Sequence, residues 1–109
     1  METFVKGDIV VFPFPFSDLT EAKRRPAAIL ATLEGEDLIV CQITSSRSDK
    51  YSISLEDKDF KQGSLKQSSF IRPNRIFTIS KSAVNYKVGS LKHEKLRELL
   101  EKLITILKQ

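Results

Sequence analysis

The sequence is poor in the residues that build most metal and acid–base sites. Its 109 residues include one cysteine, Cys41, and one histidine, His93. A lone cysteine cannot form an internal disulfide or a cysteine-based metal site, and zinc needs three or four ligands. A single histidine cannot supply a pair for general acid–base cleavage within one chain. We therefore expect no metal and no cofactor, and we expect Cys41, which follows an apolar run, to be a buried structural thiol.

Common catalytic motifs are missing as well. The sequence has no Gly-rich phosphate loop, no nucleophile elbow and no His-Glu-x-x-His helix. Asp57 and Asp59 are spaced like paired carboxylates, but the run Glu56-Asp57-Lys58-Asp59 is more typical of a solvated loop. His93 falls in the first turns of a predicted helix, where we expect a surface residue.

No apolar run approaches the roughly 20 residues that a membrane-spanning helix needs. The segment 1–6 has neither an apolar signal core nor an Arg-rich amphipathic stretch. We expect a cytoplasmic protein without membrane contact, and one domain over residues 1–109. The 18 Lys and Arg against 14 Asp and Glu give a net charge of +4, which fits a polyanionic partner.

Short apolar segments separated by polar turns fill the first four-fifths of the chain. A hairpin signal with Gly35 separates two of them, and strict alternation marks another as a half-buried strand. The polar segments 17–25 and 56–67 are expected to be loops and connections. The predicted strands are 9–12, 27–33, 38–43, 51–56, 69–71 and 75–79, the last two broken at Arg72-Pro73-Asn74.

The end of the chain has the pattern of a helix rather than that of strands. Ser90 can cap a helix, and Glu98 and Lys102 are spaced for an i, i+4 pair. Leucines recur at helical spacing, namely Leu96, Leu99, Leu100, Leu103 and Leu107. Many short strands with one terminal amphipathic helix predict a mainly β fold, a small and strongly bent barrel, rather than a βαβ arrangement.

The first candidate site is the basic triplet Lys23-Arg24-Arg25, which stands directly before Pro26 and an apolar strand. Proline restricts Arg25 to extended conformations and so limits where its side chain points. A guanidinium held at such a junction suits a phosphate oxygen. A solvated basic loop tip explains the same pattern.

Two further candidates follow strands. Thr44 is the first polar residue after an apolar run and precedes Ser45 and Arg47. Its hydroxyl could bind a ribose or phosphate, or cap a turn. Arg72-Pro73-Asn74-Arg75 lies beside Phe70 and Phe77. Basic side chains among aromatics suit single-stranded nucleic acid, and core aromatics beside surface arginines explain the pattern almost equally well.

Together these segments resemble the MazF/PemK family over nearly the whole chain. The opening strand, the Arg-Pro pair, the Ile-Thr strand end, the later strand and the closing helix occur in the family's order. The matching segments are Gly7-Asp8-Ile9-Val10 with Phe12-Pro13-Phe14, Arg25-Pro26-Ala27, Gln42-Ile43-Thr44-Ser45, Arg75-Ile76-Phe77-Thr78-Ile79 and the leucine-rich tail.

The resemblance implies an SH3-like, CcdB-like barrel that forms a homodimer, and a toxin of a type II toxin–antitoxin system. It implies metal-independent, sequence-specific cleavage of single-stranded RNA by the RNA's own 2′-hydroxyl, leaving 2′,3′-cyclic phosphate and 5′-hydroxyl ends. Arg25 and Thr44 map to the catalytic positions. The expected RNA-binding residues are Lys23, Arg24, Ser45, Arg47, Arg72 and Arg75.

The implied partners are single-stranded RNA and a cognate antitoxin, with DNA bound only through the antitoxin complex. The loop 17–22 and Arg75, which stands where relatives have a glutamine, depart from the family pattern. A non-catalytic barrel of the same fold, either a gyrase-targeting toxin or a decayed nucleic-acid-binding relative, is the alternative. Such gyrase-targeting relatives do not rely on the Arg-Pro and Ile-Thr pair.

Overall fold

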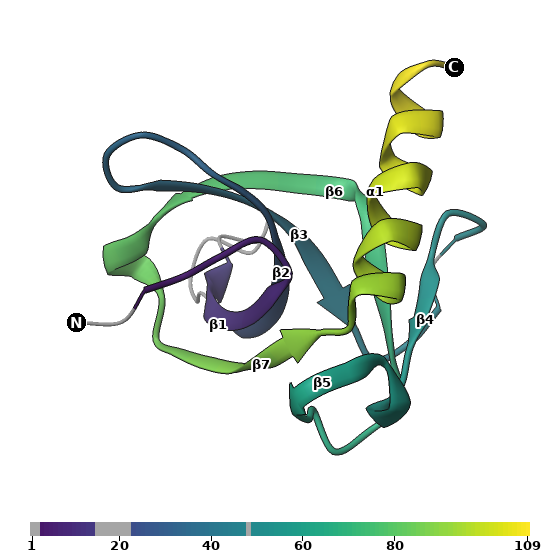
Figure 1. Ribbon diagram of the computed structural model, residues 1–109, viewed down its shortest axis with the longest axis horizontal. Helices are drawn as coiled ribbons and strands as arrows, with labels where there is room; N and C mark the ends of the chain where they lie inside the picture. Colours follow the sequence, from purple (N-terminus) through teal and green to yellow (C-terminus); the bar gives the residue numbers. More distant parts are fainter. Residues whose placement is uncertain (1–2, 15–22, 48) are drawn as a thin grey trace.

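The computed structural model describes residues 3–14, 23–47 and 49–109. Within these residues, one antiparallel sheet of seven strands curls into a half-barrel, and a C-terminal helix packs against it (Figure 1). The elements are β1 (Asp8–Phe14), β2 (Lys23–Thr32), β3 (Asp37–Thr44), β4 (Ile53–Leu55), β5 (Phe60–Gly63), β6 (Ser69–Ser80), β7 (Tyr86–Leu91) and α1 (His93–Leu107). The strand order is β4-β6-β3-β2-β1-β7-β5. The predicted mainly β barrel with a terminal helix is confirmed.

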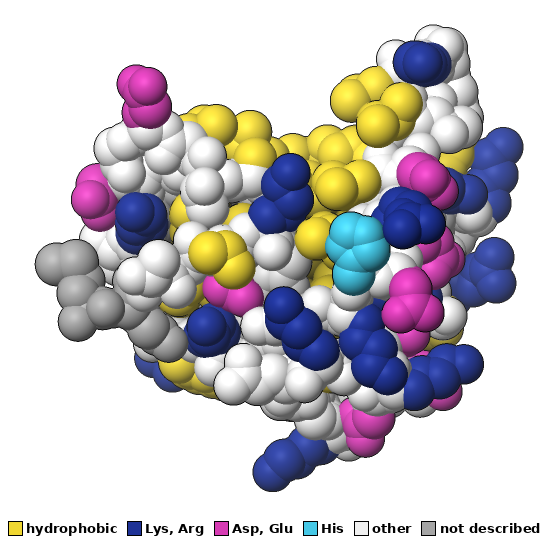
Figure 2. All heavy atoms as spheres, viewed as in Figure 1, with side chains coloured by type: hydrophobic (Ala, Val, Ile, Leu, Met, Phe, Trp, Pro, Cys, Tyr) yellow, Lys and Arg dark blue, Asp and Glu magenta, His cyan; other side chains and the backbone are white. Residues whose placement is uncertain are grey.

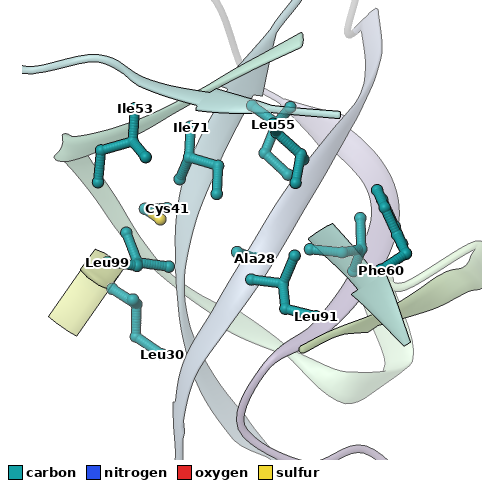
Figure 3. Close-up of a cluster of buried hydrophobic side chains, with 11 residues drawn as sticks. Ala28, Leu30, Cys41, Ile53, Leu55, Phe60, Ile71, Leu91 and Leu99 are labelled. Carbon is teal, nitrogen blue, oxygen red and sulfur yellow. The ribbon is translucent and has the colours of Figure 1, made fainter. Parts of the chain in front are cut away.

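Apolar side chains on both faces of β2 divide the core into two clusters. Ala28 and Leu30 belong to the first cluster, which α1 covers with the fully buried Leu99 (Figure 3). Ala27 and Ile29 point to the opposite face and belong to the second cluster. The central strands are therefore hydrophobic throughout because both of their faces are buried.

Cys41 lies in the first cluster and is fully buried. Burial raises the pKa of its thiol to about 12, because desolvation disfavours the thiolate. The thiolate is the nucleophilic form, so this cysteine is a packing residue. The prediction of a buried structural thiol is confirmed.

The start of β2 differs from the prediction. Lys23, Arg24 and Arg25 are not part of a loop: they pair with Phe14, Pro13 and Phe12 of β1. On its other side β1 pairs with β7 only from Asp8 to Val11, so the end of β1 is an edge, where a proline is tolerated. The segment 17–22, also predicted to be a loop, lies outside the described residues.

The predicted break in the later strand is instead a bulge. β6 continues through residues 72–74, but Gln42 of β3 pairs with Arg72 while the adjacent Cys41 pairs with Ile76. Three residues, Pro73, Asn74 and Arg75, are therefore extra on the β6 side. A proline, which lacks an N–H to donate, is acceptable in such a bulge.

Ser90 does not cap the helix. It is a buried residue of β7, and its Oγ donates to Oδ1 of the buried Asp8 at 2.9 Å. Lys92 is the N-cap of α1, without a side-chain cap, and His93 is the exposed first residue of the helix, as predicted for a surface residue. Glu98 pairs with Lys95 at 2.9 Å rather than with the predicted partner at i+4.

The segment 56–67, predicted to be connections, contains a strand and a short helix. Asp57 and Asp59 lie in the 3₁₀ helix η1 (Asp57–Asp59), where Asp59 accepts a hydrogen bond from the Glu56 amide at 2.8 Å and Asp57 accepts one from the Ser64 hydroxyl at 2.6 Å, so both carboxylates hold local structure. β5 follows and pairs with β7, where Gly63 and Gly89 meet so closely that a Cβ on either would collide with backbone. This close approach lets β5 pair with β7 as the last strand of the sheet.

Leu99→Ala is expected to lower the free energy of unfolding by roughly 2–5 kcal/mol, because it empties a fully buried site between α1 and the sheet. Urea denaturation followed by circular dichroism measures the change. Glu101→Ala, an exposed position on the same helix, is the control and should change stability by less than about 0.5 kcal/mol. Equal stabilities for the two variants would show that the helix is not docked through Leu99.

Candidate functional site on β2, β3 and β6

Arg25 and Thr44 lie on the same face of the sheet. Ala27 of β2 pairs with Gln42 of β3, and two residues further along these antiparallel strands come Arg25 and Thr44. Because side chains alternate between the faces of a strand, all four residues share one face, which continues the second core cluster to its polar end. Arg25 is half-buried at this end, so its guanidinium is positioned by the sheet rather than by a loop.

The Thr44 hydroxyl also has a local structural role. Its Oγ1 accepts a hydrogen bond from the Ser46 amide at 3.4 Å, which is the turn-capping role that the sequence left open. An accepting hydroxyl still has a hydrogen of its own to donate. Thr44 can therefore hold the turn after β3 and donate to a ligand oxygen at the same time.

Arg72 joins this face from β6. It pairs with Gln42, and Phe70 pairs with Thr44, so these side chains lie in adjacent rows of one face. The Nη2 of Arg72 is 3.2 Å from Oδ2 of Asp49, and the Asn74 amide donates to the same oxygen at 3.0 Å. The Asp49 carboxylate thus fixes the guanidinium of Arg72 across the chain turn that follows β3.

Within the described residues, two buried polar atoms where Gln42 pairs with Arg72 have no hydrogen-bond partner. They are the Nε of Arg72, a donor, and the Oε1 of Gln42, an acceptor. Leaving such groups unsatisfied costs roughly 1–3 kcal/mol each. A donor and an acceptor on directly paired residues can satisfy each other after a small rotation of either side chain.

The electrostatic environment keeps Asp49 charged. The Asn74 side chain, then the Tyr51 amide and the Arg72 guanidinium, lower the pKa of the Asp49 carboxyl below its ordinary value near 3.8. The negative charge is therefore present at neutral pH, and it orients Arg72 without removing the positive charge of the guanidinium.

The other predicted binding residues are spread more widely. Ser45 is exposed next to Thr44, and Arg47 lines a groove of about 530 Å³ between β4 and α1 whose lining includes Glu98 and Glu101. Arg75 is exposed within the bulge, with its guanidinium carbon 5.7 Å from the centre of the Phe77 ring. The side chain of Lys23 lies outside the described residues.

Arg24 is separated from Arg25 by the alternation of β2. Arg24 and Pro26 point to one face of the strand, and Arg25 and Ala27 point to the other. The basic triplet therefore does not form one cluster. Arg24 instead lines a different groove, together with residues of β1 and β7.

Sequence reasoning missed Gln42 and Asp49 as site residues. A polar residue inside the apolar run 38–43 was a signal for Gln42, because an amide in a buried strand needs a partner. Nothing in the sequence marked Asp49, which lies 23 residues from Arg72 and meets it only through the fold.

Within the part of the chain that the structure describes, no three His, Cys, Asp or Glu side chains gather in a way that could hold a metal ion. The same residues include no helix that is both long enough and apolar enough to cross a membrane. The site is thus a small half-barrel face that carries two arginines, a threonine hydroxyl and a glutamine.

The sequence matches a known family. The sequence model of the PemK-like, MazF-like toxins of type II toxin–antitoxin systems matches residues 5–107. The chain therefore belongs to this toxin family. A search of curated proteins found no match.

Solved structures share the fold. MazF from Deinococcus radiodurans superposes with a TM-score of 0.77 at 18% identity and covers 100% of both chains. An endoribonuclease from a mycobacterial species, in complex with its cognate antitoxin, has a TM-score of 0.76 at 13% identity over 97% of this chain and 96% of that one. The Mycobacterium tuberculosis toxin MazF-mt6 has a TM-score of 0.72 at 18% identity, covering 93% and 96%.

Asp49→Asn tests the link between Asp49 and Arg72. Because the pKa of Asp49 is lowered in the folded state, its charge stabilises the protein above the ordinary pKa, and that contribution is lost as the pH falls through the folded-state pKa. The wild type should melt at a higher temperature than the variant from about pH 5 to 8, and the gap should close below about pH 4. Melting curves across this range measure it, and a gap independent of pH would contradict the assignment.

Proposed function

We propose that this toxin is a sequence-specific endoribonuclease, an mRNA interferase, that cleaves single-stranded RNA without a metal. The observation that carries the proposal is the placement of Arg25, Thr44 and Arg72 on one face of three adjacent strands. Two cations and a hydroxyl, held by a sheet, can bind and orient a phosphodiester. Family membership and the endoribonuclease name of a mycobacterial structure with the same fold support the same reading.

In the proposed reaction the RNA supplies its own nucleophile. The 2′-hydroxyl attacks the adjacent phosphorus and loses its proton to water, while the bond from phosphorus to the 5′-oxygen breaks. The leaving oxygen takes up a proton and becomes a 5′-hydroxyl, and the other product carries a 2′,3′-cyclic phosphate. An intramolecular attack requires alignment and charge stabilisation, and it requires no nucleophilic side chain from the protein.

Arg25 is assigned to charge stabilisation. A guanidinium stays protonated and can grip two phosphate oxygens, and it is a poor general base. It therefore stabilises the negative charge that develops on the phosphoryl oxygens and assists the departing 5′-oxygen. Thr44 donates its hydroxyl to position the phosphate or ribose, while its oxygen remains bonded to the Ser46 amide.

Arg72 and Gln42 are assigned to binding next to the scissile phosphate. Asp49 holds Arg72 on the face that carries Thr44, where the Arg72 side chain is 21% exposed and Gln42 lies in the adjacent row. The exposed part of the guanidinium can donate to a phosphate oxygen or to the edge of a base, and Gln42 supports it from below. These residues contribute affinity and sequence preference rather than chemistry.

A second copy of the chain and an antitoxin are the proposed protein partners. Figure 2 shows an apolar surface in the hollow between the β2–β3 hairpin and the C-terminal half of α1. The elements next to it carry exposed large apolar side chains, among them Ile76 of β6 at 40% and Ile104 and Leu107 of α1 at 51% and 70%. Burial in a homodimer removes this surface from water. The family and the complex of the mycobacterial enzyme with its cognate antitoxin support the antitoxin as a partner. Binding to DNA is proposed only through the antitoxin complex.

Arg25→Ala is expected to reduce RNA cleavage by about 10²-fold or more, the usual loss when a group that stabilises transition-state charge is removed. The assay incubates protein with a long single-stranded RNA in excess EDTA and identifies the fragment ends. Wild type should give discrete fragments with 5′-hydroxyl ends. Arg97→Ala, which removes an exposed arginine from α1, is the matched control and should cleave like wild type.

An Arg25→Ala variant that cleaves RNA like wild type would contradict the catalytic assignment of Arg25. Wild-type protein that binds diverse RNAs but cleaves none would favour the non-catalytic barrel instead. Melting temperatures of all variants establish that any loss of cleavage is not a loss of folding.

Leu107→Lys is expected to weaken the proposed homodimer by about tenfold, because it puts a charge into the apolar surface that the dimer would bury. Sedimentation velocity across a concentration series measures the dissociation constant. Glu94→Lys changes an exposed residue at the other end of the same helix and should leave the constant unchanged. A wild-type protein that stays monomeric at all concentrations would contradict this part of the proposal.

A further inference from the structure

A second groove lies on the face of the sheet that carries Arg24. Its volume is about 510 Å³, and residues of β1, β2, β7 and the turn after β5 line it. Val11, Leu65 and Val88 form apolar walls, and the last two also pack against the first core cluster. The groove is therefore a hollow over the end of the core rather than a flat patch of surface.

The charge of this groove is positive. Arg24 from β2 and Lys66 from the turn 64–67 both line it, and none of its described lining residues is acidic. The groove between β4 and α1 differs, since its lining includes Glu98 and Glu101. Lys66 also borders a neighbouring pocket that Glu56 and Asp57 line. Within the groove itself two cations from different elements have no carboxylate between them, which favours an anionic ligand.

Lys66 is held in place by its own turn. Its φ is 62°, the left-handed region that side chains other than glycine seldom adopt. The Lys66 amide donates to Ser64 Oγ at 2.8 Å, and that hydroxyl donates to Asp57 Oδ1 at 2.6 Å. A strained residue that is fixed by its neighbours is a common feature of ligand sites.

Tyr86 supplies an aromatic surface beside these cations. It lies in β7 opposite Val11, lines the groove, and is 53% exposed. A large aromatic ring left in water next to an apolar hollow can stack on a nucleobase. Cations within the same groove can then bind the phosphates on either side of that base.

We propose that the groove of Arg24, Lys66 and Tyr86 binds a nucleotide of single-stranded RNA outside the catalytic face. The base stacks on Tyr86 above Val11, and Arg24 and Lys66 bind the flanking phosphates. The proposal rests on the proposed ribonuclease function for the identity of the ligand. It goes beyond that function because Arg24 and Arg25, adjacent in sequence, then serve separate sites on opposite faces of β2.

The experiment measures binding of a fluorescein-labelled decanucleotide of degenerate sequence by anisotropy. Every 2′ position carries a methoxy group, so the probe cannot be cleaved. Tyr86→Ala should weaken binding about tenfold and leave the salt dependence unchanged, because stacking involves no counterion. Arg24→Gln and Lys66→Gln should each reduce the slope of log K against log salt by about 0.7, the value for one phosphate contact on a single strand.

Three controls make the result specific. Tyr86→Phe keeps the ring and should bind like wild type, whereas Tyr86→Leu should bind like Tyr86→Ala. Arg97→Gln removes a cation outside the groove and should leave the slope unchanged. Melting temperatures establish that each variant is folded, which is expected because Arg24, Lys66 and Tyr86 are all exposed.

The proposal and the ribonuclease assignment fail in different ways. If the Tyr86, Arg24 and Lys66 variants keep the wild-type probe affinity and the wild-type salt dependence, RNA binding in the groove is contradicted, even if Arg25→Ala abolishes cleavage. A different result is that groove variants bind the probe like wild type while their RNA cleavage is no longer inhibited by the antitoxin. That result would assign the groove to a segment of the antitoxin and would overturn the proposal. Groove-dependent probe binding by a wild-type protein that cleaves no RNA would support the groove and contradict the ribonuclease.

Discussion

The structure depends on the two-sided burial of β2. Because side chains alternate along a strand, Ala28 and Leu30 pack under α1 while Ala27 and Ile29 pack into the second cluster. The register of β2 against both neighbours is fixed by this burial, since a slip of one residue would exchange the two sets. At the polar end of β2 the same alternation places Arg25 on the face of the sheet that also carries Thr44 of β3. The core therefore sets the geometry of the site.

The strand-rich architecture and its closing helix were predictable from local pattern. The apolar segments around Gly35 predict two strands, and the leucine spacing of α1 predicts a helix. Burial of a strand or of a helix face leaves a regular spacing of apolar residues in the sequence. β5 escaped prediction because Phe60 is its one buried residue, and a single apolar residue has no period. Ser90 was misassigned because serine before a helix resembles a cap, whereas its partner Asp8 lies 82 residues away.

The candidate site shows the same division. Arg25 and Thr44 could be proposed as site residues from the sequence because each stands at the junction of a polar segment with an apolar strand. Gln42 and Asp49 were not found, since their roles depend on Arg72, which reaches them through strand pairing and an ion pair. The separation of Arg24 from Arg25 required the knowledge that β2 begins at Lys23. The parts of the candidate site that could not be predicted are those that depend on contacts between residues far apart in the sequence.

The bulge in β6 has a consequence for how this protein can evolve. Residues 76–80 pair with β3 in the core, residues 70–72 pair with β3 at the site, and the extra residues 73–75 separate the two halves. Arg75 is exposed within the bulge, so a change of this side chain can be absorbed there without moving the pairing of the core half. Pro73 is buried and Asn74 is bonded to Asp49, so changes at these two positions act on the fold and on the partner of Arg72. The bulge thus lets the surface beside Arg72 vary while the hydrophobic scaffold keeps its pairing.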